Sequence, residues 1–417
     1  MIPTDWEFLK LQDTNLTIID GDRGNNYPKS DEFTNDGFCL FLSAKNITKN
    51  GFRLEEKQFI SEERDNLLRK GKLKDLDIII TTRGSVGHIA YNENIPYKDM
   101  RINSGMVILR NNDKNINQKY IYKLFASSVI QRQIEKIAFG SAQPQLTVKE
   151  INNLKLPLPP LKEQEKIANI LSTADDKIDA IASRIQKAET LKKGLLQKLL
   201  SEGIGHSEFK DSELGKIPLS WKVDTITSVS KKINVGFVGT CEKFYTDRTN
   251  GVLMIRTGNI KEGKIDLTNL KYISYEFHNK NTKSQLKIND LLIARHGSSG
   301  LCSIVPEDFP EANCLNIVMI RIDRMKSNPI FTMYLFNSNI IQTQMKKKKA
   351  GSTQGVVNTK EIAKTMILIP PLEEQKQIAD ILSTADEKLE VLRAKKEKYE
   401  TLKKGLLQKL LSGEVRV

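Results

Sequence analysis

Two short segments combine cationic side chains with glycine and serine at the spacing of a tight turn. Residues 82–88 read TRGSVGH and residues 295–300 read RHGSSG, and each follows an apolar run typical of a strand. Glycine lets a backbone approach a phosphate, arginine can donate two hydrogen bonds to a guanine edge, and serine can pair with either group. Their recurrence favours nucleic-acid readers; an ordinary hairpin turn is the alternative for each segment alone.

Further polar side chains lie around these segments. Gly-Ser-x-Gln stretches begin at residues 140 and 351, and the lysine run 346–349 could neutralise several phosphates or could simply be solvated. The candidate DNA-binding residues are Lys45, Arg83, Ser85, His88, Ser141, Gln143, Gln145, Arg256, Arg295, His296, Ser298, Ser299, Lys346, Lys347, Ser352 and Gln354.

Sequence motifs for catalysis are missing. The sequence contains no G-x-x-x-x-G-K-[ST] loop and no G-x-G-x-x-G after a strand, so a nucleotide site is not indicated. The four histidines and four cysteines do not have a zinc spacing. We therefore expect no catalytic residue, metal or cofactor in this chain, with a single-chain enzyme whose site has no known motif as the alternative.

Composition points to an anionic partner. The 417 residues are enough for two to four structural units, and 65 lysines and arginines against 51 acidic residues give a net charge of +14. Such a surface suits a polyanion, although a basic charge can also serve solubility alone. Four cysteines without disulfide spacing, no signal region and no apolar run of about 20 residues favour the cytoplasm.

The chain repeats itself. The segment TLKKGLLQKLLS occurs at 190–201 and at 401–412, and a shift of 211 residues aligns 159–201 with 370–412 at 28 of 43 identical positions. Weaker echoes include I-P-x-x-W at residues 2 and 217. These matches predict a tandem duplication of a variable domain followed by a nearly fixed helix. The predicted boundaries are 1–158 and 217–369 for the domains, 159–202 and 370–413 for the helices, and 203–216 for a linker.

The fixed segments have the apolar spacing of coiled-coil helices. A linker of about 15 residues reaches at most about 50 Å, less than the roughly 60 Å of each helix, so an antiparallel pair with one domain at each end is expected. The alternative is that each helix only covers its own domain. The predicted seam residues are Ile167, Leu171, Ile178, Ile181, Ile185, Leu195, Leu199, Ile378, Leu382, Leu389, Leu392, Leu406 and Leu410.

The variable domains have an α+β pattern. Strand-like runs occupy 38–47, 75–91 and 104–110 in the first domain, followed by a helical stretch at 119–138. The second domain has the same order, with strand-like runs at 251–260, 290–300 and 316–322 and a helical stretch at 329–349. The predicted fold class is therefore α+β, with two similar domains joined by two long helices in a pseudo-two-fold arrangement.

The paired P-P-L-x-E-Q-x-x-I-A-x-I-L-S-T-A-D helix starts, the G-S-x-Q segments, the I-P-x-x-W openings and GVLMIRTGNI together resemble the DNA-specificity subunit of type I restriction-modification systems. The resemblance covers essentially the whole chain. It implies two target recognition domains that read a split double-stranded DNA site, and helices that fix the gap. It also implies two methyltransferase subunits and restriction subunits as partners, which would carry S-adenosylmethionine, ATP and Mg. A coiled-coil adaptor whose domains bind proteins is the alternative.

Overall fold

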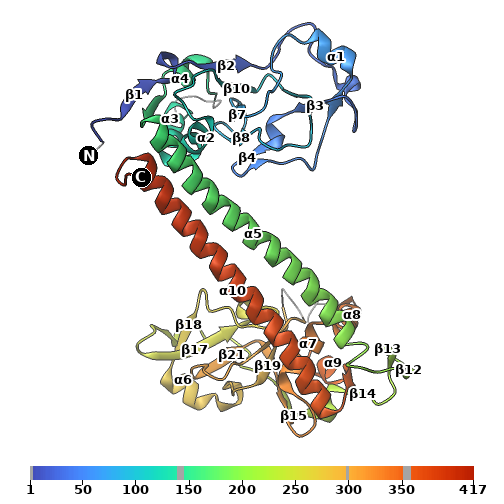
Figure 1. Ribbon diagram of the computed structural model, residues 1–417. Coiled ribbons are helices and arrows are strands. Elements are labelled where there is room, and N and C mark those ends of the chain that lie inside the picture. The colour runs from blue at the N-terminus through green and yellow to red at the C-terminus, as the bar shows by residue number, and fades with distance from the viewer. Residues whose placement is uncertain (1–2, 139–144, 297–299, 351–357) are drawn as a thin grey trace. The chain divides into compact units, whose positions relative to one another are not determined.

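The computed structural model describes residues 3–138, 145–296, 300–350 and 358–417. The chain divides into two compact units (Figure 1). Unit 1 combines Met1–Ala182 with Ala394–Val417, and unit 2 is Ser183–Arg393. Both divisions fall inside long helices, so each unit contains one mixed domain and a part of each helix.

The domain of unit 1 is built around a four-stranded antiparallel sheet in the order β2-β10-β7-β8. Alternate side chains of β7 face different cores: Ile78 and Ile80 pack with the helices, whereas Ile79 packs toward the sheet β6-β3-β9. The strands are β1 (Glu7–Lys10), β2 (Leu16–Asp20), β3 (Cys39–Leu42), β4 (Ile47–Thr48), β5 (Gly51–Phe52), β6 (Phe59–Ile60), β7 (Ile78–Thr81), β8 (Ile89–Tyr91), β9 (Met100–Ile102), β10 (Met106–Asn111) and β11 (Lys155–Leu158). The helices are α1 (Glu62–Leu67), α2 (Gln118–Ala126), α3 (Ser128–Ala138) and α4 (Val148–Asn152).

Unit 2 repeats this frame. Its four-stranded sheet has the order β15-β22-β19-β20, and a second sheet has the order β16-β18-β17-β21. The strands are β12 (Phe209–Ser212), β13 (Gly215–Pro218), β14 (Lys222–Thr225), β15 (Ser230–Val235), β16 (Tyr245–Thr246), β17 (Gly251–Arg256), β18 (Lys271–Ser274), β19 (Asp290–Ala294), β20 (Cys302–Ile304), β21 (Ala312–Leu315), β22 (Ile317–Ile322) and β23 (Met366–Ile369). The helices are α6 (Tyr275–Lys280), α7 (Pro329–Asn337), α8 (Asn339–Ala350) and α9 (Thr359–Ala363).

The helical stretch predicted in each domain is two helices rather than one. The break falls at Ser127 between α2 and α3, and at Ser338 between α7 and α8. Both serines have extended backbones, with ψ of 160° and 158°, and each hydroxyl donates to a carbonyl three residues earlier at 2.6 Å. Serine side chains compete with helical hydrogen bonding in this way, so an apolar periodicity alone does not locate the break.

The segment between the first long helix and the second domain, predicted as a linker over 203–216, contains the start of a hairpin. Strands β12 and β13 pair as an antiparallel hairpin, with Phe209 opposite Pro218 and Ser212 opposite Gly215. The segment is therefore folded back on itself rather than extended.

Two long helices, α5 (Leu161–Leu199) and α10 (Leu372–Leu411), contribute to both units. In unit 1 the start of α5, at Ile167, shares a core with the end of α10, at Leu410. In unit 2 the end of α5, at Leu199, shares a core with the start of α10, at Ile378. The helices therefore run antiparallel within each unit.

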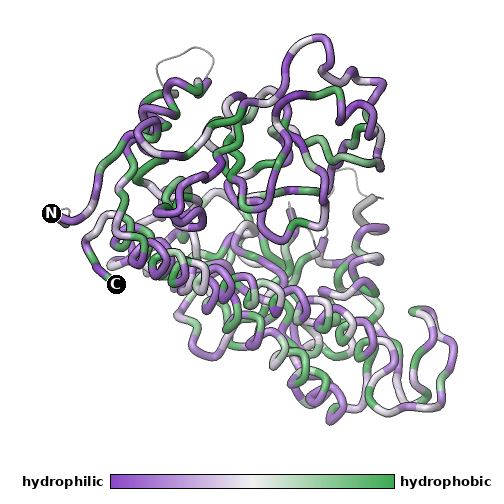
Figure 2. The backbone as a smooth tube through the Cα atoms, turned by 45° about the horizontal axis from the view of Figure 1, so that its top comes forward, coloured by the Kyte–Doolittle hydropathy of each residue, from purple (hydrophilic) through white to green (hydrophobic). Residues whose placement is uncertain are grey.

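Both long helices are amphipathic. Hydrophobic and hydrophilic residues alternate along them (Figure 2). Every residue of the predicted seam is buried or half-buried. The relative placement of the two domains stays a prediction.

Two lysines interrupt the apolar seam at equivalent places, and each meets an aspartate of the other helix. Lys192 Nζ lies 2.5 Å from Asp386 Oδ1 in unit 2, and Lys403 forms the same ion pair with Asp175 in unit 1. Burial of Asp175 opposes ionisation, but Lys403 and Lys123 outweigh it, so the pKa of this carboxyl is lowered. The end of each repeat thus pairs with the start of the other.

The Glu-Gln pair at each helix start joins the helix to its domain. Glu163 accepts a hydrogen bond from the Trp6 indole at 3.2 Å, and Glu374 accepts one from the Trp221 indole at 3.0 Å. The following Gln164 accepts the backbone N–H of Asn117 at 2.9 Å, just before α2. These contacts give the I-P-x-x-W and E-Q repeats a structural role.

Candidate nucleic-acid interface

Four loops of unit 1 meet at one edge of its main sheet, which we call reading edge 1. They are residues 21–24 after β2, residues 69–71 between α1 and β7, the β7-β8 hairpin turn 82–88, and the β9-β10 turn 103–105. Because β2, β7 and β10 are antiparallel neighbours, the end of β2, the end of β7 and the start of β10 lie at the same edge.

Hydrogen bonds hold these loops together. The N–H groups of Thr82 and Arg83 donate to Gly105 O at 2.8 and 3.3 Å. Arg23 Nη2 donates to Ser104 O at 3.3 Å, and a Cβ on Gly21 would lie only 2.1 Å from Asn103 O. Glycine at position 21 is therefore required by the close approach of two backbones.

Reading edge 1 exposes four cationic side chains, Arg23, Arg69, Lys70 and Arg83. Among the residues that the structure describes, no side-chain hydrogen bond is found for Arg69, Lys70 or Arg83. An exposed edge with unengaged cations and open hydrogen-bond donors is suited to phosphate oxygens and base edges.

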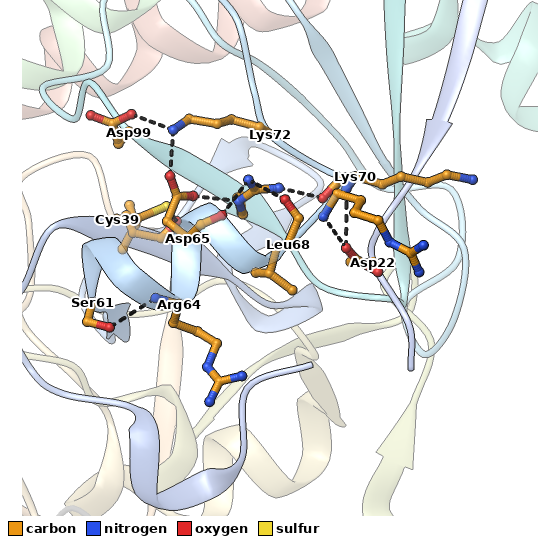
Figure 3. A network of polar contacts seen from close by, with 12 residues as sticks. Asp22, Cys39, Ser61, Arg64, Asp65, Leu68, Lys70, Lys72 and Asp99 are labelled. Carbon is orange, nitrogen blue, oxygen red and sulfur yellow. Dashed lines mark hydrogen bonds and ion pairs between the residues drawn. The ribbon is translucent and has the colours of Figure 1, made fainter. Parts of the chain in front are cut away.

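A buried polar network fixes residues 65–71 in this edge (Figure 3). The Arg101 side chain is buried: it pairs with Asp65 at 2.5 Å and donates to Leu68 O and Lys70 O at 2.9 and 2.7 Å. Lys72 adds a second ion pair to Asp65 at 2.6 Å. Burial of Asp65 disfavours its charge, but the hydrogen bonds from Lys72 and Arg101 outweigh that effect and lower the pKa of this carboxyl.

Asp22 also holds the loop 69–71, through hydrogen bonds to its backbone. Its Oδ2 accepts the backbone N–H groups of Arg69 and Lys70 at 2.5 and 3.2 Å (Figure 3). Partial burial opposes ionisation, but these N–H groups and that of Arg23 outweigh it and lower the pKa of Asp22. The backbone N–H groups of Arg23, Arg69 and Lys70 therefore all donate to the ionised Asp22 carboxylate, which holds the three cationic residues together.

Unit 2 has an equivalent edge, which we call reading edge 2. It contains residues 236–239 after β15, residues 282–284 between α6 and β19, residues 295–296 after β19, and residues 314–316. A Cβ on Gly236 would lie 2.4 Å from Cys314 O, the same close approach as at Gly21. Phe237 N–H donates to Cys314 O and Asn316 N–H donates to Phe237 O, both at 2.9 Å.

The structure separates the sequence-predicted candidates into groups. Arg83 and Ser85 are exposed on the turn of reading edge 1, and the backbones of Arg83 and Gln145 form an isolated β-bridge. His88 is half-buried, with its Nδ1 3.3 Å from Ile47 O. Lys45 is exposed on a neighbouring turn. Ser141, Gln143, Ser298, Ser299, Ser352 and Gln354 lie outside the described residues.

The remaining candidates belong to unit 2. His296 is exposed at reading edge 2, whereas Arg295 is half-buried. Arg256 is half-buried too, and its Nη2 donates to Asn269 O at 2.7 Å. Lys346 and Lys347 are exposed on α8. Which of these side chains contact DNA stays a prediction.

Sequence reasoning missed Arg23, Arg69 and Lys70. None belongs to a repeated motif, and the positions in unit 2 equivalent to Arg23 and Arg69 hold other residue types. Glycines 21, 24 and 71 beside them were the available signal, because Gly24 and Gly71 have φ of 114° and 83° and mark tight turns.

Residues 3–190 and 218–401 match one family model, the type I restriction modification DNA specificity domain. The chain belongs to this family. The two matched stretches account for most of the sequence, so membership in the type I specificity family holds for both repeats. The family that the helix motifs and the other repeated segments predicted is thereby confirmed.

Individual relatives agree with this assignment. The chain is 28% identical over 434 aligned residues to the type I restriction enzyme MjaVIII specificity subunit of Methanocaldococcus jannaschii, covering 100% of this chain and 94% of that protein. It is 22% identical to the EcoKI specificity subunit of Escherichia coli K12, covering 90% and 81%. The comparisons give no support to the adaptor alternative.

A solved structure has the same fold. The type I restriction-modification S subunit from M. genitalium aligns with a TM-score of 0.62 at 16% identity, covering 98% of this chain and 96% of that one. The α+β fold with paired similar domains and two long helices is thereby confirmed.

Within the described ranges no group of three or more histidine, cysteine, aspartate and glutamate side chains could hold a metal ion. No helix in the described part of the chain is long and apolar enough to cross a membrane.

Proposed function

We propose that this chain selects the DNA sequence on which a type I restriction-modification complex acts. The observation that carries the proposal is that one chain of the specificity family presents two equivalent loop edges with different side chains on the same frame. Each edge would read one short half-site in double-stranded DNA, and the long helices would set an unspecific gap between them.

The partners in this proposal are two methyltransferase subunits, which bring S-adenosylmethionine, and restriction subunits, which use ATP and Mg. This chain would contribute recognition and no catalysis. The tandem repeat supports two partner copies, because identical segments on α5 and α10 offer the same surface twice. The complex would act on DNA in the cytoplasm.

The first experiment is co-expression with the methyltransferase subunit in a host that lacks DNA methylation, followed by mapping of modified adenines across the genome. A bipartite motif with two unlike halves and one fixed gap is the expected result. A stable complex of the two proteins that modifies no DNA would contradict DNA selection by this chain.

A further inference from the structure

The two reading edges are structurally equivalent but chemically different. The equivalence follows from strand pairing. Arg110 of β10 binds the buried Asp77 directly before the paired strand β7, and Arg321 of β22 binds the buried Asp290 at the start of the paired strand β19. These anchors and the paired Gly21 and Gly236 place the cationic loop residues of unit 1 opposite defined residues of unit 2.

The exposed cations of reading edge 1 are mostly replaced in reading edge 2. The counterparts of Arg23, Arg69, Lys70 and Arg83 are Val238, Thr282, Lys283 and His296, all of them exposed. Four lysine or arginine side chains in reading edge 1 therefore correspond to one lysine, Lys283, in reading edge 2.

The turn between the strands changes in the same direction. Asn103 and Ser104 of unit 1 correspond to Cys314 and Leu315 of unit 2. The backbones of Leu315 and Phe237 form an isolated β-bridge, and both side chains are half-buried. Val238, next to Phe237, is 58% exposed. Reading edge 2 thus presents an apolar group where reading edge 1 presents hydrogen-bond donors.

Base chemistry distinguishes these two surfaces. An exposed arginine can donate two hydrogen bonds to O6 and N7 of guanine, whereas an apolar side chain contacts the C5-methyl group of thymine. Arg83 meets the first requirement, because its backbone is fixed by Gly105 O and by the bridge to Gln145 while its side chain is exposed. Val238 meets the second.

We propose that the two half-sites differ in kind: unit 1 reads a guanine through Arg83, and unit 2 reads a thymine methyl group through Val238. Arg23, Arg69 and Lys70 bind phosphates beside the guanine. This assignment rests on the proposed DNA-reading function and adds which base each edge selects.

The test for unit 1 uses the complex with its methyltransferase subunit and the variant Arg83→Ala. One G·C pair in one half-site should lose its selection by roughly ten- to a hundredfold, and the other half-site should be unchanged. Lys114→Ala is the matched control, because this exposed lysine has the same charge and follows the opposite end of β10. The half-site that responds to Arg83→Ala is thereby assigned to unit 1.

The test for unit 2 uses duplexes in which each thymine of the other half-site is replaced in turn by deoxyuridine, which lacks only the methyl group. Wild-type complex should bind one of these duplexes about fourfold more weakly. Val238→Asn should bind both duplexes equally. Met325→Ala, at an 83% exposed position beyond the other end of β22, should keep the wild-type difference.

The outcomes separate this inference from the proposed function. Absence of any bipartite modification would overturn the function itself. A bipartite site whose G·C selection is unaffected by Arg83→Ala, or whose thymine methyl groups are all dispensable, would overturn the base assignment and leave the function standing.

Discussion

At the residue scale, the buried Asp65-Arg101 pair matters because it holds the backbone from which Arg69 and Lys70 extend. The Asp65 side chain is 1% exposed and that of Arg101 is 6% exposed, so neither charge is stabilised by water. Removing one partner of such a pair leaves the other charge buried without compensation, which costs about 3–5 kcal/mol. The network is therefore a support for reading edge 1 rather than a contact with DNA.

We predict that Asp65→Asn lowers the free energy of unfolding of unit 1 by about 3 kcal/mol at pH 7. The pKa of Asp65 is lowered in the folded state, so its contribution is present above the unfolded value of about 3.9 and is lost as pH falls through the folded value. Below about pH 4, the free energy of unfolding of the variant should therefore fall less steeply with falling pH than that of the parent. Denaturant unfolding at several pH values measures both effects. Asp31→Asn, at an exposed position, should change neither.

The loop cations permit a second prediction at this scale. Affinity for DNA falls with salt, and each phosphate contact that is removed makes the slope of log affinity against log salt less steep by about 0.9. The triple variant Arg23→Ala, Arg69→Ala, Lys70→Ala should therefore reduce the magnitude of that slope by about 2 to 3, with the selected sequence unchanged. Binding titrations from low to high salt measure the slope, and an unchanged slope would remove these residues from the interface. Lys49→Ala, exposed on another loop, serves as the control.

At the element scale, the seam between α5 and α10 explains why the repeat is so strict. The lysine of TLKK in one repeat pairs with the aspartate of STAD in the other, and the pairing is reciprocal. Each aspartate also binds its own domain: Lys123 Nζ reaches Asp175 at 2.5 Å, and the Tyr334 hydroxyl donates to Asp386 at 2.7 Å. A change in either segment would therefore disturb three elements at once.

A charge reversal tests this pairing. Lys192→Glu places two carboxylates together in unit 2 and should lower the stability of that unit by roughly 1–2 kcal/mol, a modest value because both side chains are partly exposed. Adding Asp386→Lys should restore most of the loss. Thermal unfolding of the full chain is the measurement, with the exposed neighbour variant Lys193→Glu as the control. Equal losses in Lys192→Glu and Lys193→Glu would mean that the seam pair is unimportant.

The same elements show how far sequence reasoning reaches. Periodicity and self-alignment predicted the long helices and the shared domain frame, because these depend on spacing within one segment. Arg23, Arg69 and Lys70 escaped prediction because strand order, rather than spacing, brings loops from distant parts of the chain to one edge. The breaks at Ser127 and Ser338 escaped prediction because a local hydrogen bond of a serine hydroxyl accompanies each of them, and apolar spacing does not reveal such a bond.

At the scale of the whole molecule, the proposed function makes helix length a determinant of the DNA gap. The two compact units divide after Ala182 in α5 and after Arg393 in α10, positions that are equivalent in the repeat. Four residues inserted in both places would preserve the antiparallel pairing within each unit and add about 6 Å of helix. Insertion after Ala182 alone would leave α5 and α10 unequal in length.

We therefore predict that the matched double insertion lengthens the unspecific gap by about one or two base pairs, because 6 Å corresponds to roughly two steps of 3.4 Å along DNA. Both half-sites should stay as in the parent, since neither reading edge is altered. Mapping of modified adenines in the presence of the methyltransferase subunit reads the gap and the half-sites together. Unchanged spacing would contradict the role of the helices as a ruler, whereas altered half-sites would show that the insertion had disturbed the domains instead.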